Sequence, residues 1–130
     1  MSIEMRMLLW TTALGIAQLL LAAALATAQR GVGWNVSARD GMAAPLTGVA
    51  GRMERAWRNL METFPFFAAL ALAAVAGGRG DATTAIGAQL YFWSRLVYVP
   101  LYALGVPYLR SLVWTIGLWG LLQMLWGLVT

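Results

Sequence analysis

The stretch RAWRNLMETFPFF, residues 55–67, places two arginines, an asparagine and a glutamate at the entrance of an apolar segment. Residues three or four positions apart share one face of a helix. A polar stripe therefore runs one turn into this segment. It consists of Arg55, then Arg58 or Asn59, and then Glu62. Ionisable groups inside a membrane helix are costly, and they normally face a bundle interior or a wet cavity. The stretch thus predicts a membrane helix that carries part of an internal polar site.

The composition is that of a membrane protein. Of 130 residues, 61% are hydrophobic and only 11% are charged, whereas a soluble domain has about 25% charged residues. A bilayer core of about 30 Å needs about 20 apolar residues per helix. We therefore expect one domain, residues 1–130, that folds as an all-α bundle of four transmembrane helices. The predicted spans are about 7–28, 60–76, 82–104 and 108–129.

Two residue types are absent from the chain, and their absence excludes several kinds of site. The chain has no cysteine and no histidine, so it has no disulfide, no thiolate nucleophile and no imidazole base or metal ligand. We expect no metal. The net charge of +4 lies in loops and at helix ends, which suits a surface of anionic membrane lipid. No basic patch is interleaved with exposed aromatic residues, so we expect no nucleic-acid partner.

The arginines predict the orientation, because cytoplasmic loops of membrane proteins are enriched in Lys and Arg. We expect the first and third loops in the cytoplasm and both termini outside. The basic residues are all arginine, as is common in GC-rich bacterial genomes, so we expect a bacterial inner (plasma) membrane. The predicted cytoplasmic side holds six arginines and the other side two: Arg30, Arg39, Arg52, Arg55, Arg58 and Arg110 against Arg6 and Arg79.

The predicted connections differ in length. Residues 29–51 form the only long loop, whereas the other two are short, so spans two to four should be antiparallel neighbours. The first span ends in ATAQ, residues 26–29, which resembles a signal-peptidase site. Its apolar run is longer than the 7–15 residues of a signal peptide, so we expect it to remain as a membrane helix.

Two further polar groups point to the same membrane level. Arg95, Tyr98 and Tyr102 form a stripe on the third span, and Arg110 and Ser111 begin the fourth span at the same end. So many guanidinium groups around few acids favour an anionic ligand, because arginine binds carboxylates in bidentate fashion. A purely structural alternative is that Glu62 neutralises Arg58 or Arg95 while the tyrosines anchor the helices at the interface.

The run at residues 55–67 and a second segment, SRLVYVPLYALGVPYLRS at residues 94–111, together resemble the signature of the MAPEG superfamily (membrane-associated proteins in eicosanoid and glutathione metabolism). The resemblance implies a homotrimer with glutathione, as cosubstrate, between neighbouring subunits near the cytoplasmic side. It also implies that Arg110 stabilises the glutathione thiolate, with Ser111 beside it. The residues that would hold the tripeptide are Arg30, Arg55, Arg58, Asn59, Glu62, Arg95, Tyr98 and Tyr102.

The implied activity is that of a glutathione-dependent transferase or peroxidase. A free thiol has a pKa of about 8.5, and a nearby cation such as Arg110 favours the reactive thiolate. The thiolate would attack a lipophilic electrophile from the bilayer or reduce a lipid hydroperoxide. Some relatives have histidine where Tyr98 stands, and tyrosine and glutamine where Trp114 and Leu118 stand, which leaves glutathione binding open.

Two other functions are compatible with parts of the sequence. One is a non-catalytic, lipid-binding or scaffold member of the same fold, because the family includes binding proteins that are not enzymes. The other is a small multidrug exporter. The second is disfavoured because such exporters need an acid in the middle of the first helix, where this chain has only Gln18 as a strongly polar residue. Whether the protein is an enzyme therefore stays open at this level.

Overall fold

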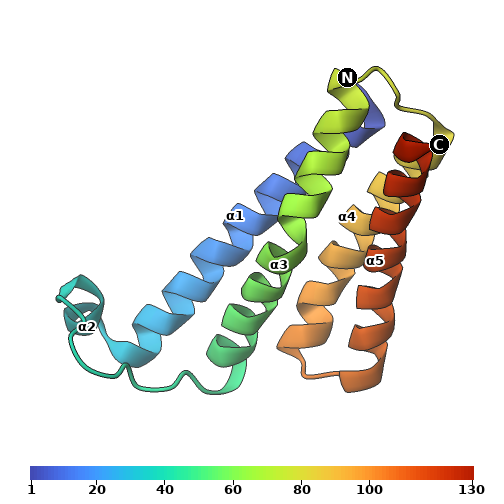
Figure 1. Ribbon diagram of the computed structural model, residues 1–130. Helices are drawn as coiled ribbons and strands as arrows, with labels where there is room; N and C mark the ends of the chain where they lie inside the picture. Colours follow the sequence, from blue (N-terminus) through green and yellow to red (C-terminus); the bar gives the residue numbers. More distant parts are fainter.

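The protein is built from helices alone. The computed structural model describes residues 1–130 and contains no strand. Four long helices lie side by side, and one short helix lies in the first connection (Figure 1). The predicted all-α class is confirmed. The elements are α1 (Ile3–Arg30), α2 (Val32–Val36), α3 (Gly48–Ala76), α4 (Ala82–Ala103) and α5 (Pro107–Val129).

Three of these helices, α1, α3 and α5, are long and apolar enough to cross a membrane by length and composition. The predicted third span coincides with α4, which is 22 residues long. It is not among the three because Gln89, Arg95 and several tyrosines interrupt it, so that no stretch of the required length is apolar enough. Arg95 and two of these tyrosines contribute to the candidate site.

The first connection is shorter and more helical than expected. Residues 29–51 were predicted as a loop, but α1 continues to Arg30, α2 follows, and α3 already begins at Gly48. The Gln29 side-chain amide donates to the Thr47 carbonyl at 2.8 Å, and its oxygen accepts from the Thr47 N–H at 3.1 Å. This pairing joins the end of α1 to the start of α3 across the connection. A prediction from Gly and Pro content misses such a tertiary contact.

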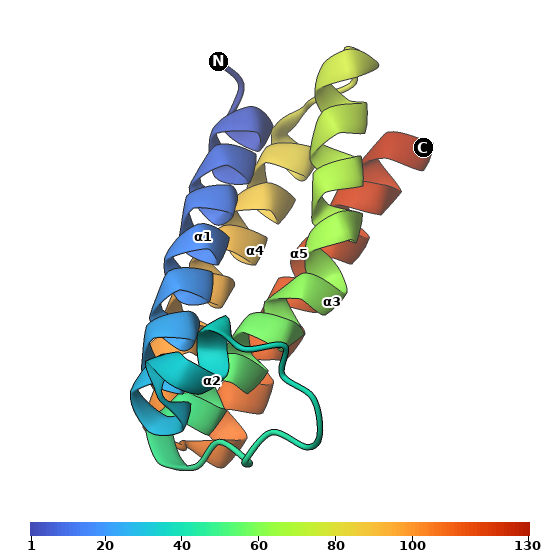
Figure 2. The same cartoon turned by 90° about the vertical axis from the view of Figure 1, so that its left-hand side faces the viewer.

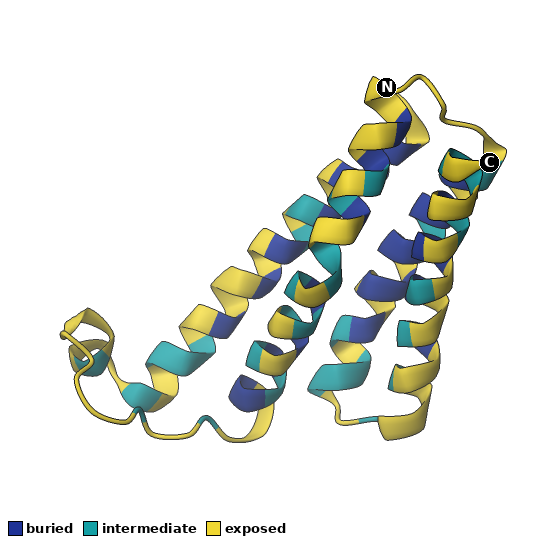
Figure 3. Ribbon diagram, in the orientation of Figure 1, coloured by how far each residue is buried: buried dark blue, intermediate teal, exposed yellow.

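The buried residues lie where the helices face one another (Figure 3). Many of the exposed residues on the outside are large and apolar. Leu60, Phe67 and Met124 are completely buried. Phe67 on α3 stacks on Tyr91 of α4 with ring centroids 4.3 Å apart. The Tyr91 hydroxyl lies 2.7 Å from the Thr63 hydroxyl, which satisfies a polar group inside the bundle.

Helices α4 and α5 approach each other closely through glycines. A Cβ atom added to Gly87 would lie 2.6 Å from the carbonyl oxygen of Gly120, and one added to Gly120 would lie 2.6 Å from the carbonyl oxygen of Gly87. Small residues at such contacts let helix backbones pack tightly where lipid surrounds the bundle. The close contact holds α4, with its polar residues, against α5.

The two ends of the bundle differ. The termini and the turn between α3 and α4 lie at one end, and the first connection with α2 and the turn between α4 and α5 lie at the other (Figures 1 and 2). At the first end, Glu4 is buried and accepts a hydrogen bond from the Thr84 hydroxyl at 2.5 Å. The second end, which we call the arginine end, holds the start of α3 and α5 and the end of α4.

Candidate functional site

Arg95 on α4 is held inside the bundle although it is charged. Only 3% of its surface is exposed. Its Nη1 donates to Asn59 Oδ1 on α3 at 2.8 Å, and its Cζ lies 4.4 Å from the centroid of the Tyr98 ring. Its Nε has no partner in the chain. A buried guanidinium thus keeps one hydrogen-bond donor unused.

Two further arginines gather around the neighbouring ring of Tyr102. Tyr98 and Tyr102 meet edge to face, with centroids 5.5 Å apart. The Cζ of Arg110 lies 4.5 Å from the Tyr102 centroid, and that of Arg55 lies 5.9 Å away. Three helices therefore bring six predicted site residues together. We call them the arginine–tyrosine cluster: Arg55, Asn59, Arg95, Tyr98, Tyr102 and Arg110.

The arginine–tyrosine cluster carries three positive charges and no carboxylate. The only ion pair in the chain joins Arg58 to Glu54 at 2.9 Å, outside the cluster. Cation–π contacts are worth about 0.5–2 kcal/mol each and leave the net charge unchanged. Guanidinium groups with free N–H donors bind carboxylates and other oxyanions well. The cluster is therefore suited to an anionic ligand.

Four predicted residues lie outside the cluster: Arg58, Glu62, Ser111 and, in a separate hollow, Arg30. Arg58 is exposed and paired with Glu54. Glu62 is exposed and forms no salt bridge with Arg58 or Arg95, but its charge interacts electrostatically with Arg95. The structural alternative in which it neutralises one of these arginines therefore stays a prediction. The Ser111 hydroxyl is exposed and turns back toward the Pro107 carbonyl at 3.4 Å. Their proposed roles stay predictions.

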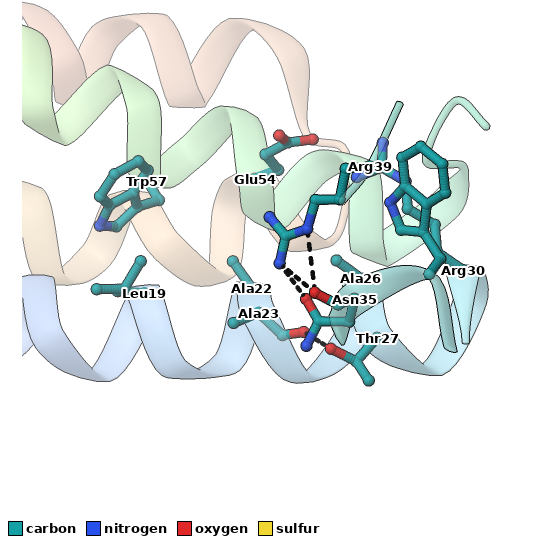
Figure 4. A pocket seen from close by; sticks show the side chains of 11 residues that line it. Leu19, Ala22, Ala23, Ala26, Thr27, Arg30, Asn35, Arg39, Glu54 and Trp57 are labelled. Atoms are coloured by element: carbon teal, nitrogen blue, oxygen red, sulfur yellow. Dashed lines mark hydrogen bonds between the residues drawn. The ribbon is translucent and has the colours of Figure 1, made fainter. Parts of the chain in front are cut away.

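Arg30 lies in a different hollow, between α1, α2 and the start of α3 (Figure 4). The hollow has a volume of about 320 Å³. Arg30 Nε donates to the Ala44 carbonyl at 2.9 Å, and Arg39 donates to the Asn35 side-chain oxygen at 2.6 Å. Glu54 and small α1 side chains complete the lining. Within one chain, Arg30 and the arginine–tyrosine cluster thus belong to different sides of the molecule.

Two residues that support the cluster were not among the predicted site residues. Arg52 donates from Nε to the Ala103 carbonyl at 2.9 Å, which fixes the start of α3 to the end of α4. Trp114 on α5 packs against the buried group of Ala56, Tyr98 and Val113, as Tyr102 does. Its position, four residues after Arg110, was a usable signal because such residues share a helix face.

Comparison with known proteins supports one assignment. None of the curated proteins matches the chain. The MAPEG family matches it over residues 7–130, which is nearly its whole length and contains every residue of the arginine–tyrosine cluster. The chain therefore belongs to the MAPEG family, which includes glutathione transferases and peroxidases.

Proposed function

We propose that this protein is an integral membrane, glutathione-dependent transferase or peroxidase that acts on lipophilic electrophiles. The observation that carries the proposal is the arginine–tyrosine cluster, with its three arginines and no acid. Glutathione has two carboxylates, which arginine forks bind, and a thiol whose ionised form Arg110 favours. The nucleophile arrives with the cosubstrate, so the absence of Cys and His from the chain is no obstacle.

We place the glutathione between subunits of a homotrimer. Glu62 is exposed on a helix apolar enough to cross a membrane, where a bare carboxylate is costly unless another chain or a ligand covers it. Arg30 lines a hollow on another side of the same chain. A neighbouring copy that presents its Arg30 hollow to the arginine–tyrosine cluster would bring the two sets together. Glu62 would then accept a hydrogen bond from the ligand ammonium group.

We also propose that α4 crosses the membrane with α1, α3 and α5. Its Arg95 and Tyr98 are buried against other helices rather than exposed to lipid, so its lower hydropathy does not prevent insertion. The arginine end would then face the cytoplasm, since it holds six arginines and the opposite side holds two.

The experiment is a calorimetric titration of glutathione into the detergent-purified protein, combined with ultraviolet absorbance of the thiolate. The wild-type protein should bind glutathione and show the thiolate band. Arg110→Ala should lose the band while the protein remains folded, because the cation that favours the thiolate is gone. Arg79→Ala, in the exposed turn at the opposite end, is the matched control and should behave as wild type. No binding at millimolar glutathione would refute the proposal.

A groove between α1 and α4 favours the alternative, a non-catalytic lipid-binding member of the family. Its volume is about 570 Å³, and all eight of its lining residues are apolar, among them Trp10, Phe92 and Trp93. It would accept an acyl chain. Binding of a lipid analogue without any thiolate band would favour this function over the enzymatic one.

A further inference from the structure

Trp114 lies one helical turn beyond Arg110 on the same face of α5. At 1.5 Å per residue, the two Cα atoms are about 6 Å apart along the axis. The half-buried indole packs against the buried trio of Ala56, Tyr98 and Val113. It therefore forms part of the wall of the arginine–tyrosine cluster, on the side away from the arginine end.

The indole N–H of Trp114 makes no hydrogen bond in the chain. It is also not among the fully buried polar side-chain atoms without a partner, which are Gln18 Nε2 and Arg95 Nε, so it is not completely enclosed. Arg110, Trp114 and Leu118 are all half-buried and follow one another at intervals of four. They form an incompletely covered stripe that runs from the cluster toward the middle of the bundle.

We infer that Trp114 determines which electrophiles the site accepts, and that it favours planar conjugated carbonyl compounds. The inference rests on the proposed function, in which Arg110 holds the thiolate. Reacting atoms must approach to about 3–3.5 Å, so the electrophilic carbon would lie within one turn of Arg110, beside the indole. An aromatic face stacks well on a flat conjugated system.

The indole N–H also suits the reaction of such a compound. The thiolate electron pair forms the C–S bond to the β-carbon of an enone, and the π electrons of the alkene move to the carbonyl oxygen, which becomes an enolate oxygen. The enolate then takes a proton from water, which leaves a hydroxide ion. The proton that the thiol released on ionisation neutralises this hydroxide, so the overall reaction neither gains nor loses a proton. A donor placed at the developing oxyanion lowers the barrier. An iodoalkane reacts instead by loss of iodide with the C–I bonding pair, and it presents neither a flat system nor an oxygen.

The test compares oct-1-en-3-one with 1-iodooctane as electrophiles for glutathione, using kcat/KM in detergent. Trp114→Phe keeps an aromatic ring but removes the donor, and it should lower the enone rate about tenfold, as expected for one hydrogen bond to a developing charge. Trp114→Leu removes the ring as well and should lower the rate roughly threefold further. The kcat/KM for 1-iodooctane should stay within about twofold of the wild-type value in both variants, since this electrophile uses neither the indole N–H nor the aromatic face.

The control is Trp119→Leu, because Trp119 is on the same helix but is 61% exposed. It should change neither rate. An unchanged enone rate in Trp114→Phe, or an equal loss for both electrophiles, would overturn the inference and leave Trp114 as a packing residue. Thiolate absorbance is recorded for each variant before any electrophile is added. A wild-type protein without the thiolate band would instead refute the proposed function itself.

Discussion

At the scale of single residues, the hydrogen bond between Asn59 and Arg95 is the contact on which the buried charge depends. Asn59→Leu removes the only hydrogen-bond partner of the Arg95 side chain and should lower the free energy of unfolding by about 1.5–3 kcal/mol, typical of a hydrogen bond to a charged group. Denaturant midpoints in detergent measure the loss. Adding Arg95→Met to Asn59→Leu should recover part of it, because the unpaired buried charge is gone. Arg58→Met, which breaks an exposed ion pair, should cost less than about 1 kcal/mol.

For Glu62, in contrast to Asn59, we expect a substitution to change ligand binding without changing the stability of the fold. Its carboxylate is exposed and forms no ion pair, so Glu62→Gln should leave the thermal midpoint and the assembly unchanged. Loss of its charge should weaken glutathione binding about tenfold, the value of one charge-assisted contact. Titration calorimetry and size-exclusion chromatography report the two properties separately. A variant that fails to fold would show that Glu62 stabilises the bundle, and would contradict its role as a ligand.

At the scale of elements, the contact between α4 and α5 depends on glycine. In Gly120→Ala the new Cβ would lie 2.6 Å from the Gly87 carbonyl oxygen and 3.0 Å from the Tyr91 nitrogen. Both are backbone atoms, so the helices must separate, at a cost of about 1–3 kcal/mol. The thermal midpoint should fall, and glutathione binding should weaken because Arg95 and Arg110 lie on these two helices. Gly33→Ala meets no atom within 4 Å, and an unchanged midpoint is expected for it.

The elements also show what the sequence can predict. Apolar length and helical spacing predict the long helices and the convergence of Arg95, Tyr98, Tyr102 and Arg110, because these depend on local periodicity. Spacing alone does not predict that Arg58 pairs with Glu54 rather than Glu62, since both acids lie four residues away. The direction of the pair does favour Glu54, because an acid that precedes the basic residue is better placed on a helix. The early start of α3 depends on the contact of Gln29 with Thr47, which joins residues distant in sequence. Side-chain partners across helices therefore require the structure.

At the scale of the whole molecule, the orientation can be tested without disturbing the core. The chain has no cysteine, so Ser37→Cys and Thr130→Cys each introduce one thiol, at an exposed position near opposite ends of the bundle. With the arginine end in the cytoplasm, a membrane-impermeant maleimide added outside intact cells should label Thr130→Cys only. Labelling of Ser37→Cys from outside would reverse the orientation. Both thiols should react once the membrane is dissolved in detergent.

The proposed assembly makes a sharper prediction, because it divides one binding site between two chains. Arg30 lies in the α1–α3 hollow and Arg110 in the arginine–tyrosine cluster, so a site between subunits takes one of them from each chain. Arg30→Ala and Arg110→Ala should each lose the thiolate band when expressed alone. In mixed oligomers, random assembly leaves about a quarter of the interfaces with both arginines, as follows for a head-to-tail ring. That fraction of the band should return.

The control is a mixture of Arg55→Ala and Arg110→Ala, whose altered residues lie in the same cluster. Arg55→Ala alone should also lose the band, because Arg55 is proposed to hold the tripeptide. Every cluster in the mixture lacks one of the two arginines, so no band should return. Recovery in the first mixture and none in the second would require a site shared by neighbouring chains, because no rearrangement within one chain restores a missing guanidinium. No recovery in either mixture would place the ligand within a single chain and leave Arg30 with a structural role in the first connection. Recovery in both would contradict the proposed site, because the band would then form without a complete cluster.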